Sequence, residues 1–508
     1  MSGQSQNNKR IAKNTLLLYF RMIIMMVVSV YTSRVNLMVL GVEDYGIYNV
    51  VGGFVTMFLM ISASLNNAIN RFLTFEIGRG DVKSLTRTFS ASVTIQFMLA
   101  GIFLLITETI GFWFVNSKMV IPEERLFAAN FVYQFSIISF ILSLITVPYN
   151  AAIISHEKMS VFAYMSIFDV FGKLTIAWST LYAPVDKLIF FSGIIMIFSL
   201  IMRLIYGIYC KRHFEECRCD FVFDREMLRN MFRFAGWNLI GSASAILRDQ
   251  GGNIIINLFF GPVVNAARAI AIQVNNAVSG FVNNFQMALT PQITKNYASG
   301  NYEYMFTLAL QGARLSFYIL YFISLPIILN TGYILDLWLD EVPAHTILFI
   351  QLILGLAMCD CLANPFSTIA LATGNIRNYQ LIIGGLQMLN LPIAYICLRQ
   401  GCIPETVTIV AIVMAIICMA FRLLMLKMMV KLSIRRVLRD VYLNVIIVGV
   451  LSPIVPYYVT MNVNKGFCSF IVSCMVCALS TFLIMIFVGC SKEERLFIYG
   501  KIYNIVRI

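Results

Sequence analysis

Hydrophobic runs separated by short polar segments dominate the chain. Apolar stretches of about 20 residues or more recur from Thr15 to Cys490, and a helix of that length crosses the roughly 30 Å hydrocarbon core of a bilayer. The pattern predicts an all-α polytopic membrane protein with about fourteen transmembrane helices. The predicted spans are approximately 13–40, 46–69, 88–114, 126–149, 159–182, 188–210, 234–260, 264–290, 304–329, 347–372, 378–398, 406–430, 440–460 and 466–489.

Composition excludes a soluble protein. Of the 508 residues, 59% are hydrophobic and only 12% are charged, with a mean hydropathy of +0.80. Soluble domains carry about 25% charged residues. This chain therefore has too few charged side chains for a surface that faces water on all sides.

The basic residues alternate between the two ends of successive spans. Of the 38 Lys and Arg, 25 fall in the predicted inner segments and 5 in the outer ones. The positive-inside rule then places both termini in the cytoplasm. Topology thus accounts for the net charge of +13, and no nucleic-acid partner is expected.

The longest polar stretch separates two halves of the chain. Arg225, Arg229 and Arg233 recur every fourth residue, with Met227 and Met231 on another side, which is typical of an amphipathic helix on the inner membrane surface. The predicted organisation is an N-terminal six-helix lobe (1–210), this cytoplasmic linker (211–233), a second six-helix lobe (234–430), and two additional helices with a cytoplasmic tail (431–508).

A faint internal repeat relates the two lobes. Gly41 and Gly80 are separated by 39 residues, as are Gly261 and Gly300, and the two pairs are offset by 220 residues. Six spans separate the copies, so both begin on the same side of the membrane. The repeat is therefore predicted to be a parallel pseudo-two-fold one.

Two spans carry stripes of polar residues. A helix that faces only lipid should be apolar on all sides, so such a stripe indicates either a water-filled cavity or a polar seam between helices. The stripe on the eighth span contains Asn265, Arg268, Asn276, Ser279, Asn283 and Gln286. The stripe on the second span contains Asn49, Gly52, Gly53, Thr56, Asn67, Asn70 and Arg71.

Charged residues inside predicted spans narrow these possibilities, because each must have a partner or a function. Asp169 and Lys173 have the i, i+4 spacing of a structural pair, and Arg203 and Arg422 lie near the inner ends of their spans, where they can extend to the membrane surface. The charges left unexplained are Arg21, Arg34, Arg248, Asp249, Arg268, Arg314 and Asp360. These seven residues are five arginines and two aspartates, so they predict a cavity that attracts an anion. The planar guanidinium of Arg is suited to binding a phosphate or diphosphate.

Asp249 has two possible roles. It could neutralise Arg248 or a neighbour, or it could carry a coupling proton or sodium ion. It precedes Gln250, Gly251 and Gly252, a sequence that can bend or unwind a helix and expose its backbone to a ligand.

The sequence shows no signs of catalysis or of a bound cofactor. His156, His213 and His345 all lie outside the predicted spans, and the longest extramembrane stretch is too short for a catalytic domain. The spacing of Cys210, His213, Cys217 and Cys219 matches no common zinc site. We expect no catalytic residues, no metal and no cofactor.

Leu40 to Gly46 (LGVEDYG), followed by Ile47, Tyr48 and Asn49 at the start of the striped second span, resembles the beginning of bacterial polysaccharide flippases. These proteins belong to the multidrug/oligosaccharidyl-lipid/polysaccharide (MOP) exporter superfamily. The fourteen-span layout, with two six-span lobes and two extra C-terminal helices, is similar to that superfamily over nearly the whole chain.

The resemblance implies a V-shaped pair of lobes around a central cationic cavity. Alternating access would carry an undecaprenyl-diphosphate-linked oligosaccharide to the outer leaflet of the bacterial inner membrane, for surface polysaccharides such as lipopolysaccharide. A proton or sodium gradient, or the membrane potential, would drive transport, and other polysaccharide-assembly proteins and membrane lipids would be its partners. The expected substrate-binding residues are Arg248, Arg268, Arg34, Arg21, Asn265, Asn276 and Asn283, with Asp249 as the coupling residue.

Two alternatives remain open. An ion-coupled multidrug or cation antiporter of the same superfamily would carry acids in an otherwise apolar cavity, which the excess of Arg disfavours. A membrane-embedded polysaccharide polymerase or ligase would present a large loop with catalytic acids or His, which this chain lacks.

Overall fold

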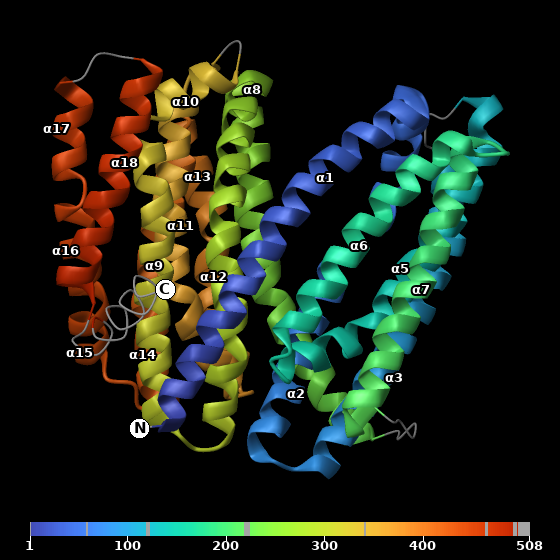
Figure 1. Ribbon diagram of the computed structural model, residues 1–508, viewed down its shortest axis with the longest axis horizontal. Helices are drawn as coiled ribbons and strands as arrows, with labels where there is room; N and C mark the ends of the chain where they lie inside the picture. The colour runs from blue at the N-terminus through green and yellow to red at the C-terminus, as the bar shows by residue number, and fades with distance from the viewer. Residues whose placement is uncertain are drawn as a thin grey trace, which may run out of the picture. The chain divides into compact units, whose positions relative to one another are not determined.

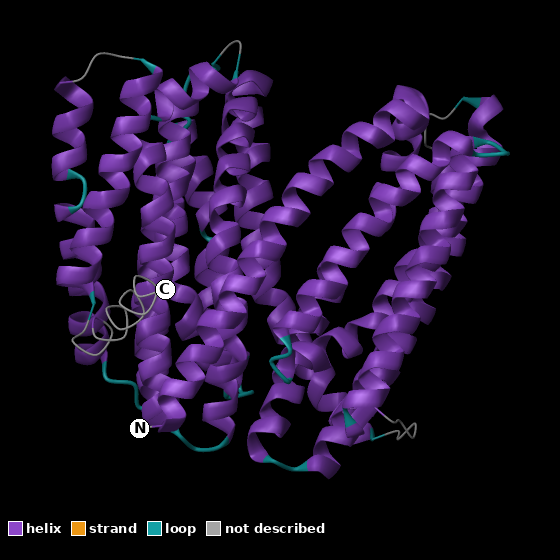
Figure 2. Cartoon of the chain, viewed as in Figure 1, coloured by secondary structure: helices purple, strands orange, loops and turns teal. Residues whose placement is uncertain are grey.

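A computed structural model describes residues 2–56, 59–117, 122–217, 224–339, 342–462, 466–490 and 495, and this part of the chain forms helices, turns and loops without any strand (Figures 1 and 2). The prediction of an all-α membrane protein is confirmed. The helices separate into two compact units. The first comprises Met1–Leu239 and Thr294–Gly300, and the second comprises Ile240–Ile293 and Asn301–Ile508. The division into four segments at 210, 233 and 430 stays a prediction.

The first unit contains the helices of the N-terminal half and both ends of the long helix α8. They are α1 (Ser2–Thr56), α2 (Leu59–Arg79), α3 (Val82–Ile106), η1 (Thr107–Gly111), α4 (Phe112–Ser117), α5 (Glu123–Ser155), α6 (Met159–Ser179), η2 (Thr180–Tyr182), α7 (Lys187–His213), η3 (Glu215–Cys217) and the end segments of α8 (Arg225–Ala298).

The second unit contains the middle of α8 and all later helices. They are α9 (Tyr302–Leu329), α10 (Thr331–Trp338), α11 (Thr346–Ala372), α12 (Arg377–Met388), α13 (Asn390–Arg399), α14 (Thr406–Val430), α15 (Ile434–Val437), η4 (Leu438–Leu443), α16 (Asn444–Leu451), α17 (Ile454–Asn462), α18 (Phe467–Ile484) and η5 (Met485–Gly489).

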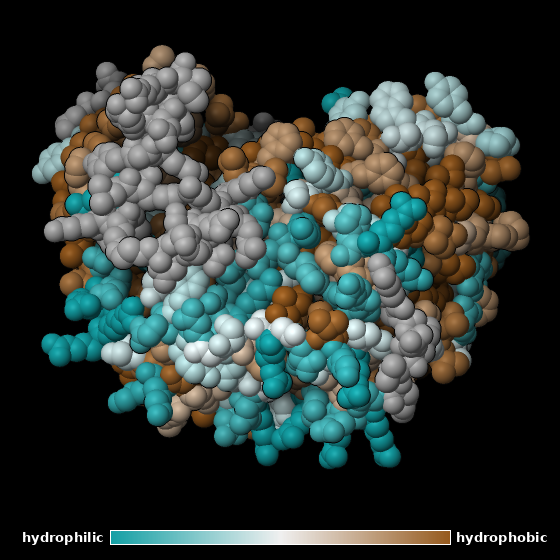
Figure 3. Space-filling model, turned by 60° about the horizontal axis from the view of Figure 1, so that its bottom comes forward, coloured by the Kyte–Doolittle hydropathy of each residue, from teal (hydrophilic) through white to brown (hydrophobic). Residues whose placement is uncertain are grey.

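Eleven helices in the described residues are long and apolar enough to cross a membrane, so the predicted count of fourteen is not confirmed. The three predicted spans that are missing from these eleven are 46–69, 234–260 and 264–290. The first of these contains residues 57 and 58, which lie outside the described residues, and the other two lie within α8, where polar residues lower the mean hydropathy. Figure 3 shows one face of the molecule, on which hydrophilic side chains gather in the lower middle of the view and hydrophobic ones lie mainly toward its edges.

Four glycines adopt the backbone conformations that the internal repeat requires. Gly41 (φ 78°, ψ 172°) interrupts α1, and Gly261 (φ 77°, ψ −172°) interrupts α8, in a region of φ/ψ space that only glycine occupies readily. Gly80 (φ 73°) and Gly300 (φ 76°) end the turns after α2 and α8. The backbone therefore repeats at the predicted offset of 220 residues.

Burial of aromatic side chains organises the first unit. Helix α5 packs against α7 and α3, and α1 packs against α6. Tyr133 on α5 is fully buried among Ile137, Val115 and Leu188, and its hydroxyl donates to the carbonyl of Thr107, 2.7 Å away. That carbonyl lies at the start of the π-turn η1, so the tyrosine provides a partner where the helix changes its pitch.

Helix α11 lies at the centre of the second unit. It packs against α9 and α14, while α18 packs against α9 and α17. Phe349 and Phe366 on α11 are fully buried. The packing fixes the rotation of α11, and Asp360, which lies between these two residues in sequence, lines a cavity together with polar residues of α8.

Candidate functional site

A polar cavity of about 530 Å³ lies within the second unit. Helix α8 contributes two stretches of its wall, one before and one after Gly261, and α9, α11, α12, α13 and α14 complete it. This volume is within the range of small-molecule sites. The polar residues that line the cavity are Arg248, Asp249, Gln250, Asn253, Arg268, Asn275, Asn276, Ser279, Asn283, Asp360, Asn364, Gln387, Asn390, Thr408 and Arg422.

Arg248 is held by two carboxylates. Its Nε lies 2.9 Å from Asp249 Oδ1, and its Nη1 lies 3.1 Å from Asp360 Oδ2 on α11. The Arg248 side chain is 15% exposed, whereas those of Asp249 and Asp360 are 54% and 37% exposed. The guanidinium is therefore neutralised locally, and the first of the two roles considered for Asp249 is observed in the structure.

Arg268 has a different environment. Its side chain is buried, at 7% exposed, and Nη1 donates to the carbonyl of Asp249 at 3.1 Å and to the Asn253 side-chain oxygen. No carboxylate of the described residues forms an ion pair with it, and Nε has no hydrogen-bond acceptor there. A buried charge without an ion-pair partner is costly, and here two hydrogen-bond acceptors and the nearby charge of Asp249 offset only part of that cost.

A glycine makes room for the Arg268 guanidinium. A Cβ atom on Gly252 would lie 2.9 Å from Arg268 Nη2 and 3.3 Å from Val407 Cγ1, and one on Gly251 would lie 2.6 Å from Leu391. The backbone at both glycines stays helical, since α8 departs from helical φ/ψ only at Gly261. The expectation that these glycines unwind the helix is therefore wrong, and a bend there stays a prediction; both glycines permit close packing.

Arg422 is a third cation in the cavity wall. It is 6% exposed, and its Nε donates to the Tyr379 hydroxyl at 2.8 Å. The interpretation of Arg422 as a residue that extends to the membrane surface is wrong, because this hydroxyl holds it inside the unit. Three arginines and two aspartates thus line the cavity, which makes it less cationic than the sequence predicts.

The structure gathers part of the predicted site. Asn276 and Asn283 line the cavity together with Arg248, Asp249 and Arg268, whereas Asn265 does not. Further along the same stripe, Gln286 donates to the Ser316 hydroxyl and the Cys361 carbonyl, both at 3.1 Å. The stripe on α8 is therefore a cavity wall over most of its length and a seam with α9 and α11 at Gln286.

The two remaining predicted residues belong to the first unit. Arg21 Nη1 donates to the Ser166 hydroxyl at 3.2 Å, and its guanidinium lies over the Phe162 ring, 4.5 Å from the centroid. Arg34 is exposed on α1. Neither lines the cavity of the second unit. The stripe predicted on 46–69 falls largely outside the described side chains, which omit 49–61.

The sequence prediction missed several members of the cavity wall. Asp360 stands out in the sequence as an intramembrane acid, but its partner Arg248 is 112 residues away, so spacing alone cannot connect them. Asn364 lies one turn further along α11, where its amide donates to Gln286 at 3.0 Å. Gln387 on α12 and Asn390 on α13 also line the cavity, and the sequence analysis did not single them out.

The model of a family of polysaccharide biosynthesis proteins matches residues 9–297. The chain belongs to this family. The family is part of the MOP superfamily, as the resemblance of LGVEDYG predicts. None of the curated proteins compared with this chain matches it.

Solved structures of MOP-superfamily proteins have a similar fold. MATE in the straight conformation is 14% identical, with a TM-score of 0.71 over 84% of this chain and 97% of that one. An outward-facing multidrug resistance MATE transporter is 15% identical, with a TM-score of 0.68 over 83% and 97% of the two chains. A MOP transporter from Pyrococcus furiosus, described as having a binding pocket of reversed polarity, is 14% identical, with a TM-score of 0.68 and the same coverages.

These likenesses show the fold. Family members of this kind and the proteins with similar structures are membrane transporters. The cavity of the second unit lies within a fold of this type.

Proposed function

We propose that this protein moves a lipid-diphosphate-linked oligosaccharide across the membrane for polysaccharide assembly. One observation carries the proposal: Arg268 is buried in a polar cavity and has no carboxylate in ion-pair contact among the described residues. A diphosphate would supply the missing negative charge and accept charge-assisted hydrogen bonds from the guanidinium. Membership in the polysaccharide biosynthesis family supports this class of substrate.

The remaining wall suits a sugar. Seven side-chain amides besides Gln250 line the cavity: Asn253, Asn275, Asn276, Asn283, Asn364, Gln387 and Asn390. Each amide offers two donors and an acceptor, which matches sugar hydroxyls that both donate and accept. The lipid tail would stay in the bilayer while the headgroup passes through the protein, because the headgroup cannot cross about 30 Å of hydrocarbon unaided.

Asp249 is the proposed coupling residue. It shares Arg248 with Asp360, so a proton or sodium ion bound by either carboxylate would weaken that carboxylate's hold on Arg248. A released Arg248 could then join Arg268 in binding the diphosphate. In this proposal the protein lies in the bacterial inner membrane with both termini in the cytoplasm, loads its substrate from the inner leaflet, and works beside other polysaccharide-assembly proteins.

Reconstituted protein and a fluorescent undecaprenyl-diphosphate oligosaccharide provide the test. Arg268→Ala should reduce flipping at least about tenfold, since a charged hydrogen bond contributes roughly 1.5–3 kcal/mol. Arg268→Lys should retain part of the activity because it keeps the charge. Arg229→Ala, at an exposed arginine of α8 in the other unit, is the matched control. Equal flipping by Arg268→Ala and the wild-type protein would contradict the proposal.

A cation antiporter is the second candidate. The observation in its favour is the pair of partly exposed carboxylates, Asp249 and Asp360, in the same cavity. An antiporter would lose transport of a cationic dye in Asp360→Asn and keep it in Arg268→Ala. The proposed flippase would instead lose transport in Arg268→Ala.

A further inference from the structure

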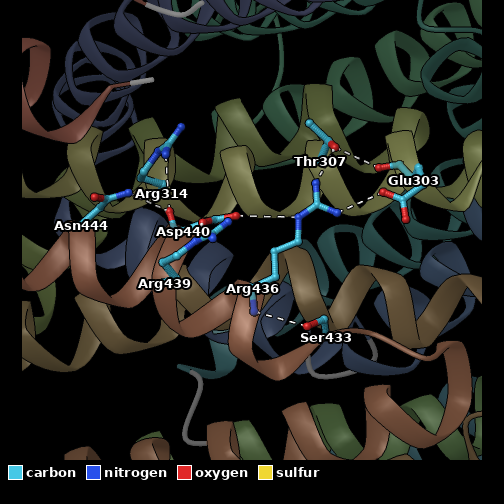
Figure 4. A network of polar contacts seen from close by, with 8 residues as sticks. All are labelled: Glu303, Thr307, Arg314, Ser433, Arg436, Arg439, Asp440 and Asn444. Carbon is cyan, nitrogen blue, oxygen red and sulfur yellow. Dashed lines mark hydrogen bonds and ion pairs between the residues drawn. The ribbon is translucent and has the colours of Figure 1, made fainter. Parts of the chain in front are cut away.

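A second polar pocket, of about 430 Å³, lies in the second unit between α9 and the last helices. Thr307 and Arg314 on α9 line one side, and Arg436, Asp440 and Asn444 on α15, η4 and α16 line another (Figure 4). The end of η5 closes the pocket with Val488, Gly489 and Cys490. None of these residues lines the cavity around Arg268.

The charges around this pocket favour an anion. Arg314 is 7% exposed, and its Nη1 lies 3.4 Å from the carbonyl of Asp440. Arg439 Nε lies 2.8 Å from Asp440 Oδ1, and Arg436 Nε lies 3.7 Å from Oδ2, so one carboxylate serves two arginines. A fourth cation, Arg495, donates from Nε to the carbonyl of Cys490 at 3.0 Å.

Besides Asp440, a second acid, Glu303, contacts an arginine of this pocket, and an anionic ligand could replace it readily. Glu303 pairs with Arg436 Nη1 at 3.0 Å, but the Glu303 side chain is 84% exposed, and exposed ion pairs are weak. Arg436 Nη2 also donates to the Thr307 hydroxyl at 3.3 Å. A phosphate oxygen could therefore take the place of the Glu303 carboxylate without disturbing a buried contact.

The position of the pocket favours a lipid as the source of that phosphate. Arg436 is the third residue of the candidate span Ile434–Thr460, and Gly489 is the last residue of Phe467–Gly489, so both lie where a span meets the headgroup region. Leu438, Leu443 and Phe487, on η4 and η5, are 52%, 52% and 57% exposed. Acyl chains would cover these apolar side chains while the phosphate occupies the pocket.

Both helices that flank the pocket are locally irregular. η4 and η5 are π-helical segments, and such segments are frequent at functional sites. We propose that this pocket binds the phosphate of an anionic phospholipid of phosphatidylglycerol type, through Arg314 and Arg436, beside the exposed apolar side chains of η4 and η5. This site is separate from the proposed transport cavity and does not depend on that function.

Binding to the full-length protein in detergent tests the proposal. Phosphatidylglycerol, phosphatidylcholine and inorganic phosphate are titrated separately, and binding is measured by native mass spectrometry and by the shift in unfolding temperature. Phosphatidylglycerol should bind and stabilise the wild-type protein, and added salt should weaken that effect. Equal stabilisation by inorganic phosphate or by phosphatidylcholine would overturn the assignment to an anionic lipid.

Two substitutions that should change phosphatidylglycerol binding in opposite directions test whether this pocket is the binding site. Arg436→Gln should weaken phosphatidylglycerol binding roughly tenfold because it removes a charged donor. Glu303→Gln, at an exposed position that should not affect folding, should strengthen binding because it removes the competing carboxylate. Arg229→Gln, at an exposed arginine of the first unit, should leave binding unchanged. Unchanged binding in Arg436→Gln and Glu303→Gln, or weaker binding in Glu303→Gln, would overturn the proposal.

Discussion

The Gly252→Ala substitution tests whether transport depends on the position of the Arg268 guanidinium or only on its charge. The added Cβ would lie 2.9 Å from Arg268 Nη2, 3.2 Å from its Cζ and 3.3 Å from Val407 Cγ1. The guanidinium is the end of a flexible side chain, so it can move aside, whereas Val407 need shift by only a few tenths of an ångström. The substitution therefore displaces the cation from its place in the cavity wall and leaves the cation in the protein.

The expected change in stability is small. Replacing glycine by alanine inside a helix stabilises the folded protein by about 0.5–1 kcal/mol. Overpacking destabilises it by typically about 1–3 kcal/mol. The net destabilisation is therefore about 0–2.5 kcal/mol. Flipping should decrease about tenfold if the displaced guanidinium no longer reaches the headgroup, since a tenfold change corresponds to about 1.4 kcal/mol.

Thermal unfolding and flipping are measured on the same preparations. Gly385→Ala is the matched control, because that glycine is also helical and in the second unit, and a Cβ there would meet nothing within 4 Å. It should keep full flipping and gain slight stability. Normal flipping by a folded Gly252→Ala protein would refute the argument that the exact placement of Arg268 matters.

Two further predictions concern charged groups. Asp360→Asn should leave Arg248 with Asp249 as its remaining carboxylate and destabilise the protein by about 1–2 kcal/mol, less than a fully buried pair because both aspartates are partly exposed; an unfolding curve identical to wild type would contradict this. The Ser84 amide and hydroxyl donate to Asp81, the N-cap of α3, and hold the pKa of this carboxyl below its ordinary value. The Asp81 carboxylate therefore contributes to the free energy of unfolding at pH values above the ordinary carboxyl pKa of about 3.9. This contribution is lost as the pH falls through the lower pKa of the folded state. Asp81→Ala should accordingly lower the unfolding temperature at neutral pH, and its difference from wild type should narrow in acid; a difference independent of pH would contradict the capping role.

The sequence predicts local features of this protein well. Hydrophobic runs identify the apolar spans because a bilayer demands a fixed length of nonpolar helix. The glycine spacing identifies the repeat, since Gly41 and Gly261 adopt a conformation that other residues rarely reach. The stripe on α8 likewise places Asn276 and Asn283 on the side of the helix that lines the cavity.

The sequence could not predict how charges combine across helices. From the sequence, only the neighbouring Asp249 is a candidate partner for Arg248, whereas the fold also brings Asp360 of α11 to within 3.1 Å. Arg422 reads as a residue at a helix end until the Tyr379 hydroxyl appears beside it. The sequence around Gly252 indicates a helix that can bend or unwind, whereas in the structure this glycine stays helical and the Arg268 guanidinium packs against it. Each of these outcomes depends on helix rotation and packing, which hydropathy does not encode.

The most direct measurement is an experimental structure of the protein with a bound undecaprenyl-diphosphate oligosaccharide. We expect a phosphate oxygen within about 3 Å of an Arg268 nitrogen, with sugar hydroxyls against the asparagines of the α8 wall. A diphosphate bound away from Arg268, with that guanidinium still lacking an anionic partner, would contradict it.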